Sequence, residues 1–386
     1  MMETLYARQL FNGYRMFSMV SVTLNNGIVT SLNTNVIPPP NAPVYELLCP
    51  AMIDTQVNGG GGVQFNHTPT PAALFTMLNA HQKTGTGALC PTLITDDIDV
   101  MRAGADAFAL ARKTQPHRLP GLHFEGPHLS AGKKGMHSFT HLRPVSDAEI
   151  ELFTRQDLGQ VIVTLAPDVV SPSQITQLTE AGVIVSLGHS EADYATATAA
   201  LNAGAAGFTH LFNAMSALTS REPGMVGAAL NHPHAFAGII VDSIHVHPAT
   251  AKPAIRLLGA SRTMLVTDAM APAASECTHF YYHDQKITRS GNTLTLANGT
   301  LAGSVLTMTE ALKNSVEQLG LPIEQALLMA TTTPARFLNK ANSHGLIEEG
   351  RCADILALDQ SLNLTHCWYD GQPVTPFKCK TAGIKS

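Results

Sequence analysis

The sequence has few charged residues and no long apolar run. Charged residues make up 14% of the 386 residues, and hydrophobic residues make up 45%. So low a charge argues against a disordered chain, and a hydrophobic share of this size is enough for a large core. No run approaches the roughly 18 apolar residues of a membrane span. We therefore expect a folded protein without a membrane segment.

A basic surface and a secretory signal are also lacking. The net charge is −5 with the 17 histidines counted as neutral, which leaves no electrostatic footprint for nucleic acid. Residues 1–13 contain no apolar core of a signal peptide. Six cysteines show neither a CxxC pair nor the spacing of a disulfide framework, which indicates free thiols in a reducing compartment; they are Cys49, Cys90, Cys277, Cys352, Cys367 and Cys379. The sequence predicts a cytoplasmic protein that binds neither nucleic acid nor membranes.

Eight short apolar runs recur along the middle of the chain, each ending in polar residues. They lie at residues 47–54, 88–95, 119–126, 160–168, 182–190, 206–212, 235–242 and 263–270. Runs that are apolar almost throughout are typical of buried parallel strands. Helix-like segments follow them, and the pairs that predict helix starts as capping boxes are Ser146–Glu149, Ser171–Gln174 and Ser190–Asp193. Eight strand–helix units predict an α/β fold, a (β/α)8 TIM-type barrel.

The two ends of the chain have a different pattern. Residues 1–46 and 345–386 alternate between apolar and polar residues, with turn signals such as Asn26-Gly27 and Asp370-Gly371. We expect both ends to build one small β-sandwich domain beside a barrel formed by residues 47–344. Residues 274–303 predict a β-hairpin excursion between the last barrel strand and a late helix.

Four polar residues terminate four different predicted strands: Glu125, His189, His210 and Asp268. In a TIM-type barrel the carboxyl ends of the strands share one active-site face. Two imidazoles and a carboxylate suit zinc and leave one position open for water, whose pKa the ion lowers to roughly 7. Asp268 is then placed to take a proton from that water and deliver it to a leaving amine. The set predicts metal-dependent amide hydrolysis.

Each of these residues also has a structural interpretation. A strand-end histidine is often only structural, Glu125 precedes the turn Gly126-Pro127, and Asp268 could cap a helix. Their joint position on four strands of one barrel favours the catalytic interpretation. The glycine run at residues 59–62 lacks the Lys-Ser/Thr of a phosphate loop and predicts a flexible turn.

Eleven segments, in order, carry a resemblance over essentially the whole chain: CPAMIDTQVNGGGGVQFN, PTLIT, GLHFEGPHLS with KKGMH, TLAPD, SLGHS, THLFNAM, REPG with VGAAL, GIIVDSIHVH, LVTDAMAP, GTLAGSVLTM and GLIEEGRCADILALD. In these segments the chain resembles the N-acetylglucosamine-6-phosphate deacetylases of the amidohydrolase superfamily. The resemblance implies hydrolytic removal of acetate from N-acetyl-D-glucosamine 6-phosphate. It makes Glu125, His189 and His210 the metal ligands and Asp268 the catalytic acid/base.

The same resemblance implies a set of substrate contacts: Met136, His137, Asn213, Ala214, Arg221, His245, Leu301, Ala302 and Gly303. In the family, the residues that match Asn213, Arg221 and His245 serve the sugar phosphate. The arginine reaches in from the partner subunit, so we expect a homodimer. The residue that matches His137 lies near the reacting acetyl group or the sugar ring.

The chain departs from the wider superfamily after the first barrel strand. Most members carry a His-x-His pair there, which completes a two-metal site, whereas this chain has Gln56 and Asn58. Amides are poor ligands for zinc compared with imidazole. We therefore expect one divalent metal per chain, with zinc the first choice, although Fe2+, Mn2+ or Co2+ fit the same ligands. Met136 is a second departure, because a small polar residue is common at that position.

Other functions stay open at this stage. Deacetylation of N-acetylgalactosamine 6-phosphate is the alternative within the same enzyme class, because the sequence does not locate the hydroxyl group that distinguishes the two sugars. Hydrolysis of a cyclic amide is disfavoured by the phosphate-binding set Asn213, Arg221 and His245. A catalytically inactive interaction protein with this fold is disfavoured because the four residues of the site are all present.

Overall fold

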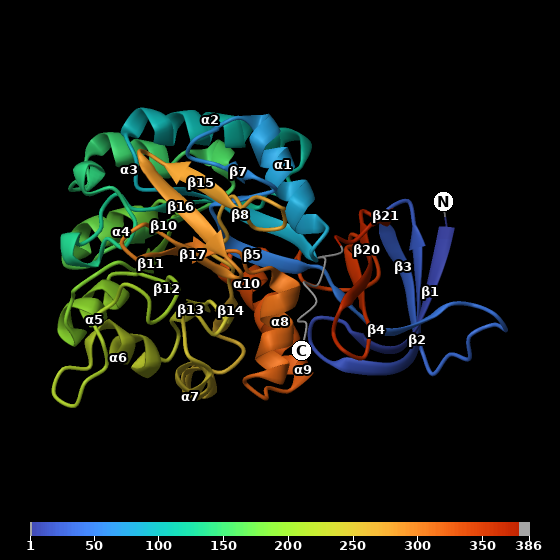
Figure 1. Cartoon of the computed structure of the whole chain (residues 1–386). Coiled ribbons are helices and arrows are strands. Elements are labelled where there is room, and N and C mark those ends of the chain that lie inside the picture. The colour runs from blue at the N-terminus through green and yellow to red at the C-terminus, as the bar shows by residue number, and fades with distance from the viewer. Residues whose placement is uncertain (1, 378–386) are drawn as a thin grey trace.

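The computed structural model describes residues 2–377, which form a barrel with a separate sheet at its side (Figure 1). Eight parallel strands make the barrel in chain order: β5 (Met52–Val57), β8 (Thr86–Ile94), β9 (Gly121–Glu125), β10 (Gln160–Leu165), β11 (Ile184–Leu187), β12 (Gly207–Phe208), β13 (Phe236–Ile239) and β14 (Thr263–Leu265). The last strand returns to the first, because the Asp268 amide donates to the Gln56 carbonyl at 3.0 Å and Val57 bridges to Ala269. The predicted TIM-type barrel is confirmed.

Helices surround the barrel on the outside (Figure 1). They are α1 (Pro71–Gln82), α2 (Ile98–Thr114), α3 (Asp147–Phe153), α4 (Pro172–Glu180), α5 (Tyr194–Asn202), α6 (Gly224–Asn231), α7 (Pro248–Leu258), α8 (Met308–Glu317), α9 (Ile323–Ala330) and α10 (Thr332–Phe337), with short 3-10 turns η1 (Ala131–Lys133), η2 (Phe139–His141) and η3 (Gln156–Leu158). Of the residues that the structure describes, none belong to a helix long and apolar enough to cross a membrane.

Two of the three predicted capping boxes are present. Ser146 caps α3 and Ser171 caps α4, each with its partner three residues later. The third prediction is wrong, because Asp193 is itself the cap of α5 and accepts the Thr196 amide at 2.8 Å. The Ser190 hydroxyl instead donates to Asp168 across the strand ends. Ser190, which follows β11, therefore forms a hydrogen bond at the barrel mouth instead of capping the next helix.

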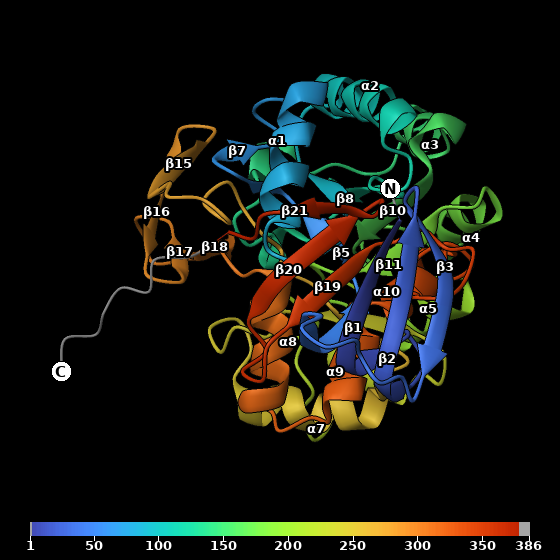
Figure 2. The same ribbon diagram turned by 90° about the vertical axis from the view of Figure 1, so that its right-hand side faces the viewer.

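The two chain ends join in one continuous sheet beside the barrel (Figure 2). Its strands, in spatial order, are β21 (Gln372–Val374), β20 (Leu364–Tyr369), β19 (Ile355–Leu358), β4 (Val44–Pro50), β1 (Met2–Phe11), β2 (Met16–Asn25) and β3 (Ile28–Thr34). All neighbours are antiparallel except β1 and β4. The small β domain expected as a sandwich is thus hydrogen-bonded as a single sheet of seven strands. The domain limits at 46/47 and 344/345 stay predictions.

The first predicted strand, residues 47–54, is divided between the two sheets. Residues up to Pro50 continue β4, where Leu47 pairs with both β1 and β19, and the barrel strand starts at Met52. Both halves are apolar because both are buried: the last four residues of β4 within the terminal sheet, and all of β5 within the barrel. An apolar run therefore marks burial without marking where one sheet ends.

A buried arginine links the sheet to the barrel. Arg118 lies just before β9 with 2% of its side chain exposed, and its guanidinium contacts Asp354 at 2.6 Å and Asp370 at 2.7 Å. Both aspartates belong to the β19–β21 end of the sheet. His117 also contacts Asp354, at 2.9 Å, and stacks on His344 with ring centroids 4.1 Å apart. These charges fix the sheet against the amino-terminal end of the barrel strands.

The excursion predicted at residues 274–303 is a four-stranded antiparallel sheet that stands beside the barrel mouth (Figure 2). It contains β15 (His279–Tyr282), β16 (Gln285–Ser290), β17 (Thr293–Thr295) and β18 (Leu301–Ser304). A two-stranded ribbon, β6 (Gly59–Gly60) and β7 (Val63–Gln64), takes the place of the flexible glycine turn expected there. Cysteines within residues 2–377 are free, and Cys379 lies outside the described residues.

Candidate active site

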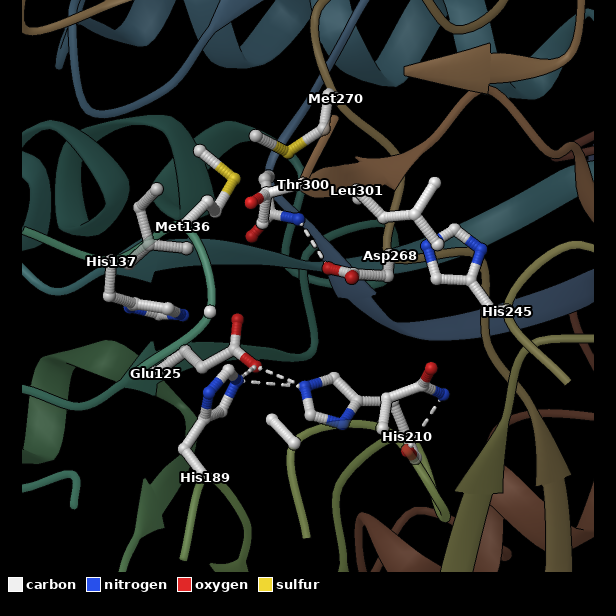
Figure 3. A pocket seen from close by; sticks show the side chains of 16 residues that line it. Glu125, Met136, His137, His189, His210, His245, Asp268, Met270, Thr300 and Leu301 are labelled. Carbon is white, nitrogen blue, oxygen red and sulfur yellow. Dashed lines mark hydrogen bonds and ion pairs between the residues drawn. The ribbon is translucent and has the colours of Figure 1, made fainter. Parts of the chain in front are cut away.

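The four predicted residues meet in one cavity at the carboxyl ends of the barrel strands (Figure 3). Glu125 is the last residue of β9, and His189, His210 and Asp268 follow β11, β12 and β14 by two or three residues. The backbone of these last three has positive φ values of 49°, 30° and 51°. For residues other than glycine such a conformation costs on the order of 1–3 kcal/mol each. The surrounding fold therefore stabilises strained turns that aim these side chains inward.

The distances among Glu125, His189 and His210 fit a metal ion. Glu125 Oε1 lies 3.3 Å from His189 Nε2 and 3.0 Å from His210 Nε2, and the two nitrogens are 3.0 Å apart. Ligands at 2.0–2.1 Å in a tetrahedron are separated by about 3.3 Å. All three side chains are buried. A carboxylate and two imidazoles at this spacing form a suitable three-ligand site for a divalent metal.

The outer nitrogen of His189 supports this assignment. Its Nδ1 lies 2.8 Å from the Lys133 carbonyl oxygen, which can only accept a hydrogen bond, so Nδ1 carries the proton. The lone pair of Nε2 is then directed at the cluster. Burial raises the pKa of Glu125, but its hydrogen bonds with His189 and His210 lower that pKa by more than burial raises it. The pKa therefore lies well below its ordinary value. The carboxylate is therefore ionised, as a metal ligand must be.

Asp268 faces this cluster from the other side of the cavity (Figure 3). Burial, followed by the nearby charge of Glu125, raises its pKa to about 6. Asn58 Nδ2 donates to its Oδ1 at 2.6 Å, and Gln56 Nε2 donates to the same oxygen at 3.2 Å. The carboxyl group is thus held in place with its second oxygen left for the cavity. A carboxyl group whose pKa is raised toward neutrality is suited to proton transfer.

Gln56 and Asn58 occupy the position where the wider superfamily carries its histidine pair. Gln56 Nε2 also donates to Glu125 Oε1, at 3.0 Å, so it bridges the metal cluster and Asp268. Both side chains are almost fully buried. Their NH2 groups supply partial positive charge to two carboxylates, which a second cation would otherwise supply. That this position holds no second metal stays a prediction.

Most of the predicted substrate contacts line the cavity: Met136, His137, Asn213, Ala214, His245, Leu301 and Gly303. Ala302 does not, because side chains alternate along β18 and that of Ala302 packs in the core of the excursion sheet. Arg221 is exposed and does not line the cavity of its own chain. Met136 and His137 lie on one side of the cavity, and His245 and Leu301 on the other (Figure 3).

Several residues of the cavity were not predicted from the sequence: Ile94, Gly135, Met270 and Thr300. Asp242 was also missed as a supporting residue. Its Oδ2 contacts His245 Nδ1 at 2.6 Å, and its Oδ1 accepts the backbone amides of Ile244 and His245. This fixes the imidazole so that its Nε2 faces the cavity. The spacing Asp-x-x-His directly after a barrel strand was a usable signal.

Comparison with known proteins agrees with this geometry. Residues 47–382 match the amidohydrolase family, and the chain belongs to that family. An N-acetylgalactosamine-6-phosphate deacetylase of Shewanella sp. (strain ANA-3) is 48% identical over 358 residues, which cover 91% of each chain. An N-acetylglucosamine-6-phosphate deacetylase of Vibrio furnissii is 34% identical over 331 residues, covering 85% of this chain and 82% of that protein.

Among solved structures, a mutant N-acetyl-D-glucosamine-6-phosphate deacetylase of Mycobacterium smegmatis in complex with N-acetyl-D-glucosamine-6-phosphate superimposes with a TM-score of 0.90. It is 28% identical, and the match covers 96% of this chain and 99% of that one. The likeness extends over the barrel and the terminal sheet together. The fold and the enzyme class therefore agree with what the sequence predicted.

Proposed function

We propose that this amidohydrolase removes the acetyl group from an N-acetylhexosamine 6-phosphate. One observation carries the proposal: a buried Glu-His-His cluster and the Asp268 carboxyl group, whose pKa is raised to about 6, face each other across one small cavity. The cavity volume is about 250 Å³, close to the lower end of the roughly 300–1,000 Å³ of small-molecule sites. That size suits a single sugar rather than a polymer.

Glu125, His189 and His210 would hold one divalent metal, with zinc the ion that their chemistry suits best. When bound, such an ion polarises a carbonyl group and makes a water molecule more acidic. Asp268 accepts a proton from the attacking water and returns it to the sugar nitrogen, because an amine leaves poorly unless it is protonated. Asn58 and Gln56 hold the Asp268 carboxyl group in the required orientation.

The phosphate of the substrate requires local donors, because the whole chain is net negative. Asn213 and His245 lie in the cavity wall. Arg221 matches phosphate through its planar guanidinium, and its exposed position suits donation to the cavity of a partner subunit in a homodimer. Mixing Arg221→Ala with Asp268→Asn chains should then restore activity, since one hybrid site would contain both native residues. No recovery in a mixture shown to exchange subunits would contradict this arrangement.

The identity of the sugar is tested by side-by-side turnover of the two epimers. The resemblance in the sequence predicts N-acetylglucosamine 6-phosphate, whereas the 48% identity to a galactosamine-type enzyme favours N-acetylgalactosamine 6-phosphate as a second candidate. Acetate release from both, with the unphosphorylated sugars as controls, gives kcat/KM for each. Turnover of neither phosphorylated sugar by metal-replete protein would contradict the proposed function. A cytoplasmic location stays a prediction from the sequence.

A further inference from the structure

A second group of metal-ligand side chains lies outside the active-site cavity. Asp96 follows β8, His141 ends η2, and His283 lies in the turn between β15 and β16. One ligand atom of each lies within 4.8 Å of the others. The His141 and His283 rings meet edge to face, with centroids 5.2 Å apart. Three segments far apart in the sequence thus present two imidazoles and one carboxylate to a common point.

The polar atoms of this group have an incomplete set of partners. His141 Nδ1 is shielded from solvent, yet it makes no hydrogen bond. The closest carboxylate oxygen, Asp96 Oδ1, lies 3.6 Å away, beyond hydrogen-bond distance. That separation is within a few tenths of an ångström of the roughly 3.3 Å between two ligands of a tetrahedral zinc ion. An unpartnered buried nitrogen at this spacing points to a ligand rather than to an internal hydrogen bond.

The Asp96 carboxylate is already fixed in position. Asn66 Nδ2 donates to its Oδ2 at 2.9 Å, and the Asp97 amide donates to its Oδ1 at 2.9 Å. The nearby guanidinium of Arg143 is neutralised by Glu149, which it contacts at 2.6 Å. A cation at this point therefore meets a preoriented negative charge, and the nearby Arg143 is already paired.

We propose that Asp96, His141 and His283 form a second, peripheral site for a divalent transition metal, which clamps the excursion sheet to the barrel. Imidazole and carboxylate together suit zinc, and a water molecule would complete four ligands. His283 is exposed at the turn, and its ring contacts the rings of His141 and Tyr282. This proposal does not depend on the proposed reaction, because none of its residues line the catalytic cavity.

Such a clamp would join the two flanks of the active-site mouth. The excursion sheet carries Thr300 and Leu301 on the cavity wall, and the segment that ends in His141 carries Met136 and His137. At present a polar contact beside the group, from the Tyr282 hydroxyl to the Thr95 carbonyl at 2.6 Å, holds the β15–β16 turn on the barrel. A metal would add a second point of attachment.

The test is a titration of purified enzyme, already loaded with its tightly held metal, with ZnCl2 by calorimetry. Wild-type protein should bind one further ion per chain. His283→Asn keeps a residue that tolerates the positive φ of 48° at this turn, and it should weaken that binding by at least roughly tenfold. His279→Asn, an exposed histidine of the same hairpin, is the matched control and should bind normally. No further ion, or equal binding by His283→Asn, would overturn the proposal.

A second measurement tests the clamp itself. Lys286 on β16 has an exposed side chain, but its backbone pairs with Tyr281 of β15, so trypsin can cut there only after the hairpin has detached and opened. Because cleavage requires this detachment, zinc at ten times its Kd should slow cutting at Lys286 about elevenfold. The effect should be present in His279→Asn and absent in His283→Asn, which also controls for any action of zinc on trypsin. Binding of the second ion without slower cleavage would refute the clamp.

Discussion

Replacement of Asp268 by asparagine tests the proposed reaction most directly. Asn58 and Gln56 both donate to Oδ1 of Asp268, and the carbonyl oxygen of an asparagine can accept the same two bonds. The variant should therefore keep the shape of the site while it loses the negative charge and the ability to accept a proton. Because Glu125, His189 and His210 are untouched, we expect the metal content to stay the same.

The expected loss falls on turnover. Removal of a general acid/base typically lowers the rate by about 10²–10⁴, which corresponds to roughly 3–5 kcal/mol of activation free energy. KM should change much less, since the phosphate-binding residues are intact. Acetate release by metal-replete Asp268→Asn, with the metal measured in the same sample, gives both quantities. Asp268→Glu, which restores a carboxylate at a displaced position, should recover part of the rate.

Two results would refute this reasoning. A kcat close to that of the wild type would remove Asp268 from the reaction. Loss of the metal from Asp268→Asn would make the side chain a ligand, and the fall in rate would then say nothing about proton transfer. The near-identical shape of aspartate and asparagine makes either result interpretable.

Four further outcomes are expected. Elemental analysis of the purified enzyme, before added zinc, should give one tightly held metal per chain; a second tightly held ion that depends on residues 54–58 would contradict the role assigned to the amide pair. Arg221→Ala should raise KM for the phosphorylated sugar strongly and barely change it for the unphosphorylated one. Asp354→Asn should cost up to about 3–5 kcal/mol in urea unfolding, because it leaves a buried guanidinium poorly paired, whereas Asp370→Asn, at 59% exposure, should cost at most about 1 kcal/mol. Burial, and then the charge of the neighbouring His117, lowers the pKa of His344 to about 4, from about 6.5 in an unfolded chain. The contribution of neutral His344 to stability is therefore complete above pH 6.5 and is lost as the pH falls toward 4. Between pH 7 and 5, His344→Gln should lose less stability than the wild type.

The barrel could be predicted because its strands are buried on both faces and their residues are therefore apolar almost throughout. Runs such as residues 160–168 are apolar on both faces, and a polar residue where each run stops marks the face on which catalysis occurs. The limits of the strands could not be read in this way. Residues 47–54 serve two sheets in turn, and a continuous apolar run does not record that change.

The residues of the site could be predicted from the sequence where the side chain itself can bind a metal or transfer a proton. Glu125, His189, His210 and Asp268 have side chains whose chemistry indicates the proposed roles, and the four line one cavity as expected. Ile94 and Thr300 have no such signature; they line the cavity only because β8 ends and β18 begins there. The direction of Ala302, away from the cavity, depends on the register of β18, which local sequence does not specify.

The order in which the terminal sheet is assembled has a consequence for synthesis of the chain. β4 ends at Pro50 and its partner β19 begins at Ile355, so 305 residues (355 − 50) separate the two neighbours. At about 5–20 residues per second, a ribosome needs roughly 15–60 s to make that stretch. During this time β4 offers an unpaired apolar edge, the kind of strand that recruits other chains. The nascent protein therefore depends on its own growing barrel, or on a chaperone, to cover Leu47 and Cys49 until the final strands arrive.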